Sequence, residues 1–323
     1  MKSERIVLAG AITALLAAIA LVGWQIVYID KQKEPVKVSV IVNNSGLDSL
    51  INFKEGLKQG ARDFDIRINI VSTTELASMT NEKEIIEKEI SNGAEALILE
   101  LYNSYNQTGY LEELNNELPI VLVNTDTSPE DVFYSVTADN NAIGEMLADE
   151  ILADTEGKAV KVGIVAGNQE QLAMFQRLSG FRNKIEGSNI EIAWQISGNR
   201  NSGTVAQMTE NQKENHADYC VALGNTETEN AIDYYNAFSG DFEGVIYGVG
   251  SSEKLVYYLD NGLIKKLVVP DEFDMGYRCA LSVAKRISYI SESEKHIETE
   301  CRIVDADSLY SIENQMIIFP EGQ

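Results

Sequence analysis

Short apolar runs rich in β-branched residues alternate with longer amphipathic stretches along most of the chain. Such runs are typical of buried strands, and apolar residues spaced three or four apart are typical of the helices that cover them. In the first half, the runs fall at 36–42, 66–71, 94–101 and 119–125, and the amphipathic stretches at 47–64, 81–93 and 104–116. This alternation predicts right-handed βαβ units and parallel sheets covered on both faces.

The same alternation begins again near residue 159, so the chain is expected to contain two similar α/β halves. The second set of apolar runs falls at 159–167, 190–197, 219–224, 244–250 and 265–270, with amphipathic stretches at 169–185, 202–214, 227–236 and 252–259. A helix at 272–290, an extended segment at 298–310 and a tail at 311–323 are expected to follow. A single core usually stops growing at somewhere around 150 to 250 residues, so a chain of 323 residues can form two lobes.

The first apolar stretch differs from all the others, because residues 6–29 carry no charge and exceed the ~20 residues that a helix needs to cross a bilayer. Trp24 and Tyr28 lie near its far end, where amphipathic rings favour the membrane interface. The alternative is a cleaved secretory signal, since the small residues at 18–20 could form a cleavage site. The mature chain would then begin with an apolar segment. We therefore expect residues 1–35 to be an uncleaved single-pass cell-membrane anchor with its linker, and the body to be extracytoplasmic.

Acidic residues outnumber basic ones 50 to 26, which gives a net charge of −24. This balance argues against nucleic acid as a partner, because phosphate contacts need concentrated lysine and arginine. Cys220, Cys279 and Cys301 are far apart, so neither a metal site nor a disulfide framework is indicated; buried free thiols and one disulfide both stay open. With only two histidines, a zinc centre is not expected, and no cofactor is predicted.

Motifs of enzymes are also missing. The segment "GVGSSEK" at 248–254 begins like a dinucleotide-binding loop, but Glu253 stands where that loop needs its third glycine. Neither a P-loop nor a G-x-S-x-G elbow occurs. A general base of the usual kind would have to be His216 or His296, both in polar segments. We therefore predict that the protein is not an enzyme.

Polar side chains gather where a strand gives way to a helix at "SVTADNNAIGEML", residues 135–147. Asp139 or Asn140 could cap the helix, since Asp and Asn are favoured there, but a cap explains only one of the three residues Asp139, Asn140 and Asn141. In open parallel sheets, ligands bind beyond the carboxyl ends of the strands. The residues thus act either as a cap alone, or as a cap together with a ligand contact or a contact between lobes. Amide and acid side chains at strand ends suit sugar hydroxyls, which both donate and accept hydrogen bonds.

Seven segments, taken together and in order, resemble a known family. They are "VSVIVNN…FKEGLKQGA", "NGAEALILE", "LPIVLVNTD", "TADNNAIGEMLADEI", "KVGIVAG…QRLSGFRNKI", "VALGNTETENAIDY" and "VIYGVGSSEKLVYYLDNGLIKKLVVPDEFDMGY". The chain from Val36 to about Tyr310 is similar to the type I periplasmic sugar-binding proteins, which include ribose- and galactose-binding proteins and the effector domains of lactose-repressor-like regulators.

The resemblance implies two Rossmann-like lobes with parallel sheets, joined by a three-stranded hinge that closes on a ligand. The N-terminal lobe would comprise 36–139 plus 271–297, and the C-terminal lobe 140–270 plus 298–323. The apolar segment takes the place of the DNA-binding headpiece of the repressors, so the repressor version is excluded.

The resemblance also implies a ligand-binding set, namely Asn44, Asp48, Glu100, Asn103, Asn124, Asn140, Phe175, Arg200, Asn225 and Ser251. Several family contacts are replaced, since Phe175 stands at a frequent ligand arginine and Gly250 at a frequent ligand aspartate. Arg177 is expected to pair with an acid across its helix.

The pattern at Asp48, Asn52, Phe53 and Gly56, the "GVGSS" loop and the closing "ENQMIIFP" resemble a Gram-positive, membrane-anchored subgroup associated with sensor histidine kinases. The sequence therefore favours an extracytoplasmic receptor that binds a small polar solute, such as a sugar, by hinge closure. The alternative is the substrate-binding subunit of an ABC sugar uptake transporter. Capture subunits of that kind in Gram-positive cells usually have a lipid-bearing cysteine, and no cysteine lies near the apolar segment.

Overall fold

The computed structural model describes residues 15–21, 34–42, 50–71, 79–105, 108–125, 133–197, 203–237, 245–290 and 295–320. The chain divides into two units, Met1–Val36 and Lys37–Gln323, and each is described by itself. In the first unit, residues 15–21 are helical and Leu15, Leu16, Ile19 and Leu21 are exposed. No helix among the described residues is long and apolar enough to span a membrane. Most of the predicted anchor at 6–29 lies outside the described residues.

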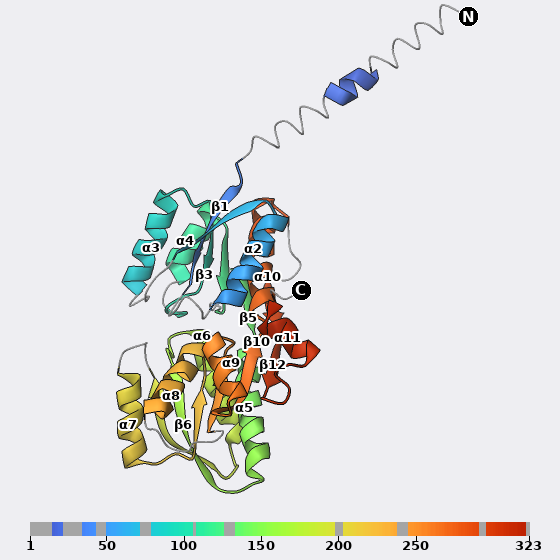
Figure 1. The fold of residues 1–323 in the computed structure, drawn as a ribbon. Helices are drawn as coiled ribbons and strands as arrows, with labels where there is room; N and C mark the ends of the chain where they lie inside the picture. The colour runs from blue at the N-terminus through green and yellow to red at the C-terminus, as the bar shows by residue number, and fades with distance from the viewer. Residues whose placement is uncertain are drawn as a thin grey trace, which may run out of the picture. The chain divides into compact units, whose positions relative to one another are not determined.

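The second unit begins with a six-stranded sheet in the order β11-β5-β4-β3-β1-β2 (Figure 1). Its strands are β1 (Val36–Ile41), β2 (Ile66–Val71), β3 (Ala96–Leu99), β4 (Ile120–Val123), β5 (Tyr134–Ala138) and β11 (His296–Thr299). The β1–β3, β3–β4, β4–β5 and β5–β11 pairs are all parallel. A strand of a parallel sheet is buried on both faces, which explains why β3 and β4 are apolar at every position.

Helices cover both faces of this sheet, with α2 (Ile51–Asp63) and α10 (Glu272–Ile287) on one side and α3 (Met79–Ser91) and α4 (Thr108–Glu117) on the other (Figure 1). The alternation along β3 follows this division. Ala96 and Ile98 belong to the buried cluster that contains the α2 and α10 side chains, and Leu97 and Leu99 belong to the one that contains the α3 and α4 side chains.

The second sheet repeats the arrangement in the order β12-β10-β9-β8-β6-β7. Its strands are β6 (Val160–Gly167), β7 (Ile190–Ser197), β8 (Tyr219–Ala222), β9 (Ile246–Val249), β10 (Ile264–Pro270) and β12 (Cys301–Val304). Its helices are α5 (Asn140–Thr155), α6 (Leu172–Ile185), α7 (Thr204–Glu214), α8 (Asn225–Ala237) and α9 (Glu253–Asp260), followed by α11 (Ile312–Ile318). The predicted α/β fold with two lobes is confirmed. One strand departs from the predicted parallel sheets, because β12 enters directly from β11 without a crossover helix and pairs antiparallel to β10.

The chain passes between the two sheets at three points, after β5, after β10 and between β11 and β12. The first two passages lead into helices whose N-caps are aspartates. Asp139 accepts a hydrogen bond from the backbone N–H of Ala142, and Asp271 accepts one from that of Asp274, both at 2.9 Å. Each cap satisfies a helix-end donor that would otherwise lack a partner, and so fixes where the new element begins.

Glycines allow one pair of helices in each lobe to pack backbone against backbone. A Cβ atom at Gly56 of α2 would lie 2.0 Å from the carbonyl oxygen of Phe273 on α10. In the second lobe, a Cβ atom at Gly144 of α5 would lie 2.0 Å from the carbonyl oxygen of Arg177 on α6. Carbon atoms cannot approach oxygen so closely, so any larger residue would push these helices apart.

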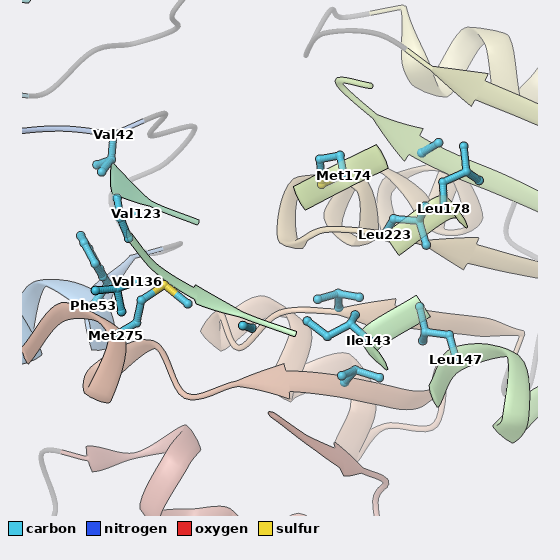
Figure 2. Packing of buried hydrophobic residues seen from close by; sticks show 14 of the residues in the cluster. Val42, Phe53, Val123, Val136, Ile143, Leu147, Met174, Leu178, Leu223 and Met275 are labelled. Atoms are coloured by element: carbon cyan, nitrogen blue, oxygen red, sulfur yellow. The ribbon is translucent and has the colours of Figure 1, made fainter. Parts of the chain in front are cut away.

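One buried cluster reaches from lobe to lobe beside the crossing strands. Figure 2 shows Val42, Phe53, Val123, Val136 and Met275 on the side of the first lobe and Ile143, Leu147, Met174, Leu178 and Leu223 on the side of the second. The crossings are thus embedded in apolar contacts, which keeps water away from their backbone hydrogen bonds.

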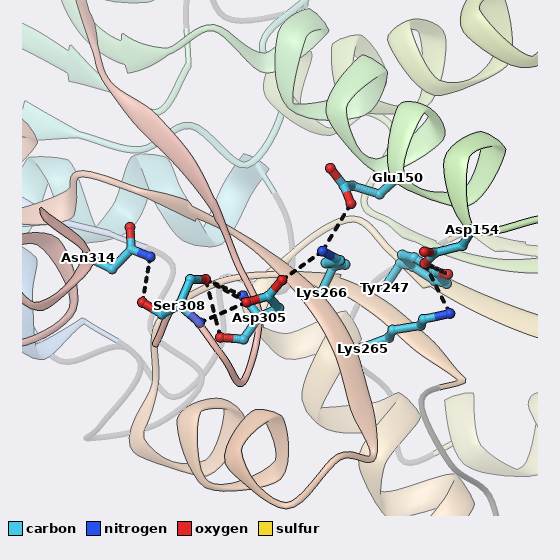
Figure 3. A network of polar contacts seen from close by, with 8 residues as sticks. All are labelled: Glu150, Asp154, Tyr247, Lys265, Lys266, Asp305, Ser308 and Asn314. Atoms are coloured by element: carbon cyan, nitrogen blue, oxygen red, sulfur yellow. Dashed lines mark hydrogen bonds and ion pairs between the residues drawn. The ribbon is translucent and has the colours of Figure 1, made fainter. Parts of the chain in front are cut away.

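A polar network ties together the parts of the second lobe that adjoin the crossings (Figure 3). Lys266 on β10 is 20% exposed, and its Nζ lies 3.3 Å from Glu150 Oε2 on α5 and 2.8 Å from Asp305 Oδ2 just after β12. Each of these three segments adjoins a different crossing. Hydrogen bonds from Lys266 and Ser308 lower the pKa of Asp305 to about 2. Burial alone would lower the pKa of Lys266. Its hydrogen bonds and the charges of Glu150 and Asp305 raise that pKa by a larger amount, so the net shift is upward.

We predict that Lys266→Met lowers the free energy of unfolding by about 1–3 kcal/mol, because two partly buried carboxylates lose their shared cation. Lys254→Met is the matched control, since Lys254 pairs with the exposed Asp233 and should cost less than about 1 kcal/mol. Urea denaturation of both variants measures the difference. Equal losses in the two would contradict a special role for Lys266.

Candidate ligand-binding cavity

A cavity of about 150 Å³ lies between the lobes, where the loops that follow the parallel strands meet. It is smaller than the roughly 300–1,000 Å³ that drug-sized ligands occupy, so it suits a small solute. Its polar lining consists of Glu100, Asn124, Asn168, Gln171, Arg177, Asn225, Thr226, Glu227 and Glu272. Its apolar lining includes Val42, Leu50, Phe53, Val123, Met174, Val249, Pro270 and Met275.

The position of Arg177 governs the polar side of the cavity. This side chain on α6 is 5% exposed, and Nε donates to Asn140 Oδ1 at 2.7 Å. Nη1 donates to the Leu223 carbonyl at 2.9 Å and Nη2 to Asn124 Oδ1 at 3.4 Å. Burial lowers the pKa of Arg177, while the charges of nearby glutamates oppose that shift. Because an arginine stays protonated in proteins, the cavity holds a fixed positive charge.

The expectation that Arg177 pairs with an acid across its helix is wrong. Its oxygen partners lie on α5, just after β8 and just after β4, and its one partner on its own helix is the sulfur of Met174, which is not an acid. The reason is the close approach of α5 and α6 at Gly144, which points the guanidinium toward the strand ends instead of toward the surface of its own helix.

The polar residues at the start of α5 have different functions. Asp139 is the N-cap, and its side chain accepts from the Ala142 backbone. Asn140 is buried and donates from Nδ2 to Thr137 Oγ1 at 2.9 Å and to the Ala138 carbonyl at 3.0 Å, so its Oδ1 is oriented toward Arg177. Asn140 therefore lies one hydrogen bond behind the cavity wall, where it fixes the arginine.

Three carboxylates face the cavity. Glu272, in the first turn of α10, accepts from Ser251 Oγ at 3.0 Å. Burial raises its pKa from 4.5 to about 7, with help from the charges of Glu100 and Asp271, although Ser251 and Arg177 act in the opposite direction. Glu100 accepts from Asn124 Nδ2 at 3.2 Å.

Glu227, in the first turn of α8, lies against two glycines at strand ends. A Cβ atom at Gly224 would lie 2.4 Å from its Oε2, and one at Gly167 would lie 2.7 Å from its Oε1. Gly167 also has a φ of +66°, a conformation that favours glycine. These two positions must therefore stay without side chains for the Glu227 carboxylate to reach the cavity.

A set of hydrogen bonds joins the lobes at the edge of the cavity. Asn168 Nδ2 donates to the Tyr102 carbonyl at 2.9 Å, and Gln171 Nε2 donates to the Leu101 carbonyl at 3.0 Å. The Ser104 backbone N–H donates to the Glu170 carbonyl at 3.0 Å. We call these contacts the latch. They connect the loop before α6 to the loop after β3, so they hold the two lobes together beside the cavity.

The structure brings some of the predicted ligand residues together. Glu100, Asn124 and Asn225 line the cavity. Asn225 Nδ2 donates to Glu229 Oε1 at 2.9 Å, and its Oδ1 accepts from the Ser252 backbone at 3.2 Å. Ser251 contacts the cavity only through Glu272.

Other predicted residues are placed elsewhere. Asn103 is buried, and its Oδ1 accepts from the Tyr105 backbone, outside the cavity lining. Phe175 is 47% exposed and is not part of the lining, because Ala173, Met174 and Arg177 form the inward face of α6. Asn44, Asp48 and Arg200 lie outside the described residues.

Sequence reasoning missed Asn168, Gln171, Arg177, Glu227 and Glu272 as cavity residues. Four of them sit just after strand β6, β8 or β10, so the rule that ligands bind beyond strand ends could have selected them. The exception is Arg177, which lies inside a helix and reaches the cavity only through helix packing.

The three cysteines are free thiols in the structure, so of the two alternatives left open by the sequence, free thiols and one disulfide, the structure has the free thiols. Among the described residues, no group of three or more His, Cys, Asp or Glu side chains is placed to hold a metal ion.

Two α/β lobes joined by three crossings, with a cavity of mixed polar and apolar lining between them, define a bilobal binding protein. The chain belongs to the periplasmic binding protein domain family, whose sequence profile matches residues 38–288. No curated protein matches the chain by sequence.

Solved structures share the fold. One is GanP, a glucose-galactose binding protein from Geobacillus stearothermophilus, with 17% identity and a TM-score of 0.74 over 86% of this chain and 100% of that one. Another is an ABC transporter solute binding protein from Agrobacterium vitis with bound D-fucose, at 17% identity and a TM-score of 0.79 over 88% and 100%. A third is the XylFII-LytSN complex, at 15% identity and a TM-score of 0.73 over 84% and 98%.

We predict that Glu272→Gln raises stability at pH 8 by about 1–3 kcal/mol, because the buried site no longer holds an ionised carboxylate. The folded chain binds the Glu272 proton more tightly than the unfolded chain does. The tighter binding of this proton stabilises the folded wild-type chain. This stabilisation is complete below pH 4.5 and is lost as the pH rises through about 7. The difference from wild type should therefore disappear toward pH 4.5.

Thermal unfolding of the wild type and the variant between pH 4.5 and 8 tests this expectation. Glu145→Gln, on the exposed side of α5, controls for the loss of one surface charge. A Glu272→Gln protein no more stable than wild type at pH 8 would contradict burial as the cause.

Proposed function

We propose that the protein binds a small sugar or sugar-like solute in the cavity between its lobes and reports the bound state by hinge closure. The observation that carries this proposal is the cavity itself, which is lined by carboxylates, amides and one guanidinium together with apolar side chains. Sugar hydroxyls need donors and acceptors together, and the carbon face of a sugar ring packs on apolar groups such as Phe53. The sugars named for proteins of the same fold, D-fucose and D-arabinose among them, support this ligand class.

Membrane attachment is part of the proposal. The uncharged stretch at 6–29 would anchor the protein as a single-pass helix and leave the body extracytoplasmic. The lobes would be 36–139 with 271–297 and 140–270 with 298–323, consistent with the three passages between the sheets. Non-catalytic binding is favoured because the family is one of binding proteins.

A sensor role is preferred over transport. Ligand binding would shift the equilibrium between an open and a closed state. The size of that shift is limited by the difference between the ligand's affinities for the two states. The XylFII-LytSN complex, a solved structure that shares this fold, supports assembly with a partner protein. The second candidate, an ABC transporter subunit, is supported by the transporter proteins among the solved structures.

We predict that one or more mono- or oligosaccharides raise the melting temperature of the full-length protein in detergent, because a ligand that binds only the folded state stabilises it. Asn140→Ala and Asn225→Ala should weaken binding by about tenfold or more, which corresponds to about 1.4 kcal/mol. The first frees the Arg177 guanidinium, and the second alters a lining amide. Phe175→Ala, on the exposed side of the same helix as Arg177, is the matched control and should bind normally. No stabilisation by any sugar would count against the proposal.

We predict that the protein co-purifies with a membrane histidine kinase after cross-linking in its own cell membranes, and that adding the bound sugar changes the recovery. Asn225→Ala should remove the effect of sugar but not the basal recovery. Mass spectrometry of the cross-linked material identifies the partner. Recovery of an ABC permease instead of a kinase would favour the transport role.

A further inference from the structure

A second hollow, of about 420 Å³, lies beside α11 and shares no described lining residue with the ligand cavity. Its walls come from the start of α2 in the first lobe, from α9 in the second lobe and from the segment around α11. We call this hollow the α11 groove, and its lining includes Asn52, Glu253, Tyr257, Asp260, Tyr310 and Phe319. Because its walls belong to both lobes, the shape of the groove depends on how the lobes are arranged.

The helix α11 is held by both lobes. Ile317 and Ile318 pack in the buried cluster of the second lobe, and Asn314 Nδ2 donates to the Ser308 carbonyl at 2.9 Å. From the first lobe, Asn52 Nδ2 on α2 donates to the carbonyls of Ile317 and Ile318 at 3.3 and 3.1 Å. These carbonyls lie in the last turn of α11, where a helix has no partners of its own for them. A change in the angle between the lobes would therefore alter the groove.

The outer side of α11 is apolar, although it is exposed. Ile312, Met316 and Phe319 are 76%, 53% and 42% exposed, and positions four and seven apart lie on one face of a helix. Tyr257 on α9 is 60% exposed, and Tyr310 just before α11 is 58% exposed. The outward side of a surface helix is normally polar, and exposed apolar side chains that gather around a hollow mark a contact site for another molecule.

The groove has an acidic rim. The charged residues in its described lining are Glu253 and Asp260, the first and last residues of α9, and both are exposed. Neither carboxylate is paired with a described lysine or arginine. Lys254, the base next to Glu253, is paired with Asp233 instead, at 2.5 Å between Nζ and Oδ1. Glu313 adds an exposed carboxylate on α11.

We propose that the α11 groove binds a partner protein through apolar side chains that are flanked by lysine or arginine. The exposed apolar residues would supply affinity, and the acidic rim would select a partner of opposite charge. The inference rests on the proposed reporting role, since a partner bound here contacts both lobes and responds to the angle between them. A second copy of the chain fits less well, because a net charge of −24 on each copy would place acidic surfaces together.

The test is site-specific photo-crosslinking of the full-length protein in its own cell membranes. A photoreactive phenylalanine analogue replaces Tyr257 on α9 or Met316 on α11. Tyr289, which is 96% exposed and lies outside the lining, is the matched control position. The two positions at the groove should form an adduct with the same partner protein at about tenfold or more the yield from Tyr289, because a specific complex holds them in contact. Mass spectrometry should place the adduct in a segment with lysine or arginine next to an apolar residue.

Glu253→Lys together with Asp260→Lys should lower the adduct yield by about fivefold or more, because attraction to the partner becomes repulsion. Changing the identified basic residues of the partner to glutamate should restore it. Glu210→Lys with Glu214→Lys, on the exposed side of α7, is the control of equal charge and should leave the yield unchanged.

An adduct with a second copy of the chain, with lipid or with an acidic segment would overturn the proposal. Equal yields at all three positions, or no adduct at the groove, would overturn it as well. Failure of every sugar in the thermal test would contradict the proposed function without altering these adducts, so the two failures are distinguishable.

Discussion

The contact between the backbones of α5 and α6 is the constraint on which the cavity depends. Gly144 and Gly180 let the two helices approach to a distance that no side chain would permit. That approach turns Arg177 inward, where Asn140 at the start of α5 receives its Nε donor. The first lobe uses the same solution at Gly56 and Gly276 between α2 and α10, and this contact sets the position of Glu272 in the first turn of α10. The cavity is therefore a product of helix packing as much as of loops.

The hinge and the latch lie on different parts of the molecule and have different chemistry. The hinge segments are fixed in the second lobe by charge, since Lys266 joins α5, β10 and the turn after β12. The latch consists mainly of side-chain amides that donate to main-chain carbonyls. A charged clamp at the base of a hinge keeps the crossing segments in register, while neutral hydrogen bonds at the opening can exchange with water at little net cost. This division is consistent with the hinge closure proposed above.

The fold could be predicted from the sequence because its signals are local. The β-branched runs and their spacing gave the strands, and the order of βαβ units gave the two lobes. The family resemblance implied Glu100, Asn124 and Asn225, which do line the cavity. Arg177 could not be found in this way, since it lies inside α6 and its direction depends on the contact between Gly144 of α5 and the backbone of α6. Phe175, two residues earlier, was selected in its place because family position alone cannot show which side of a helix faces inward.

The latch has a consequence for how such a molecule behaves at rest. Its acceptors at Leu101 and Tyr102 are peptide carbonyls, which every residue supplies, so the lobes can meet without any contribution from a captured solute. In the proposed receptor, a shut form held by these contacts alone would give a nonzero background output. Binding of the solute would then lengthen the lifetime of the shut form. The output of the proposed receptor would therefore increase gradually from a nonzero level instead of starting from zero.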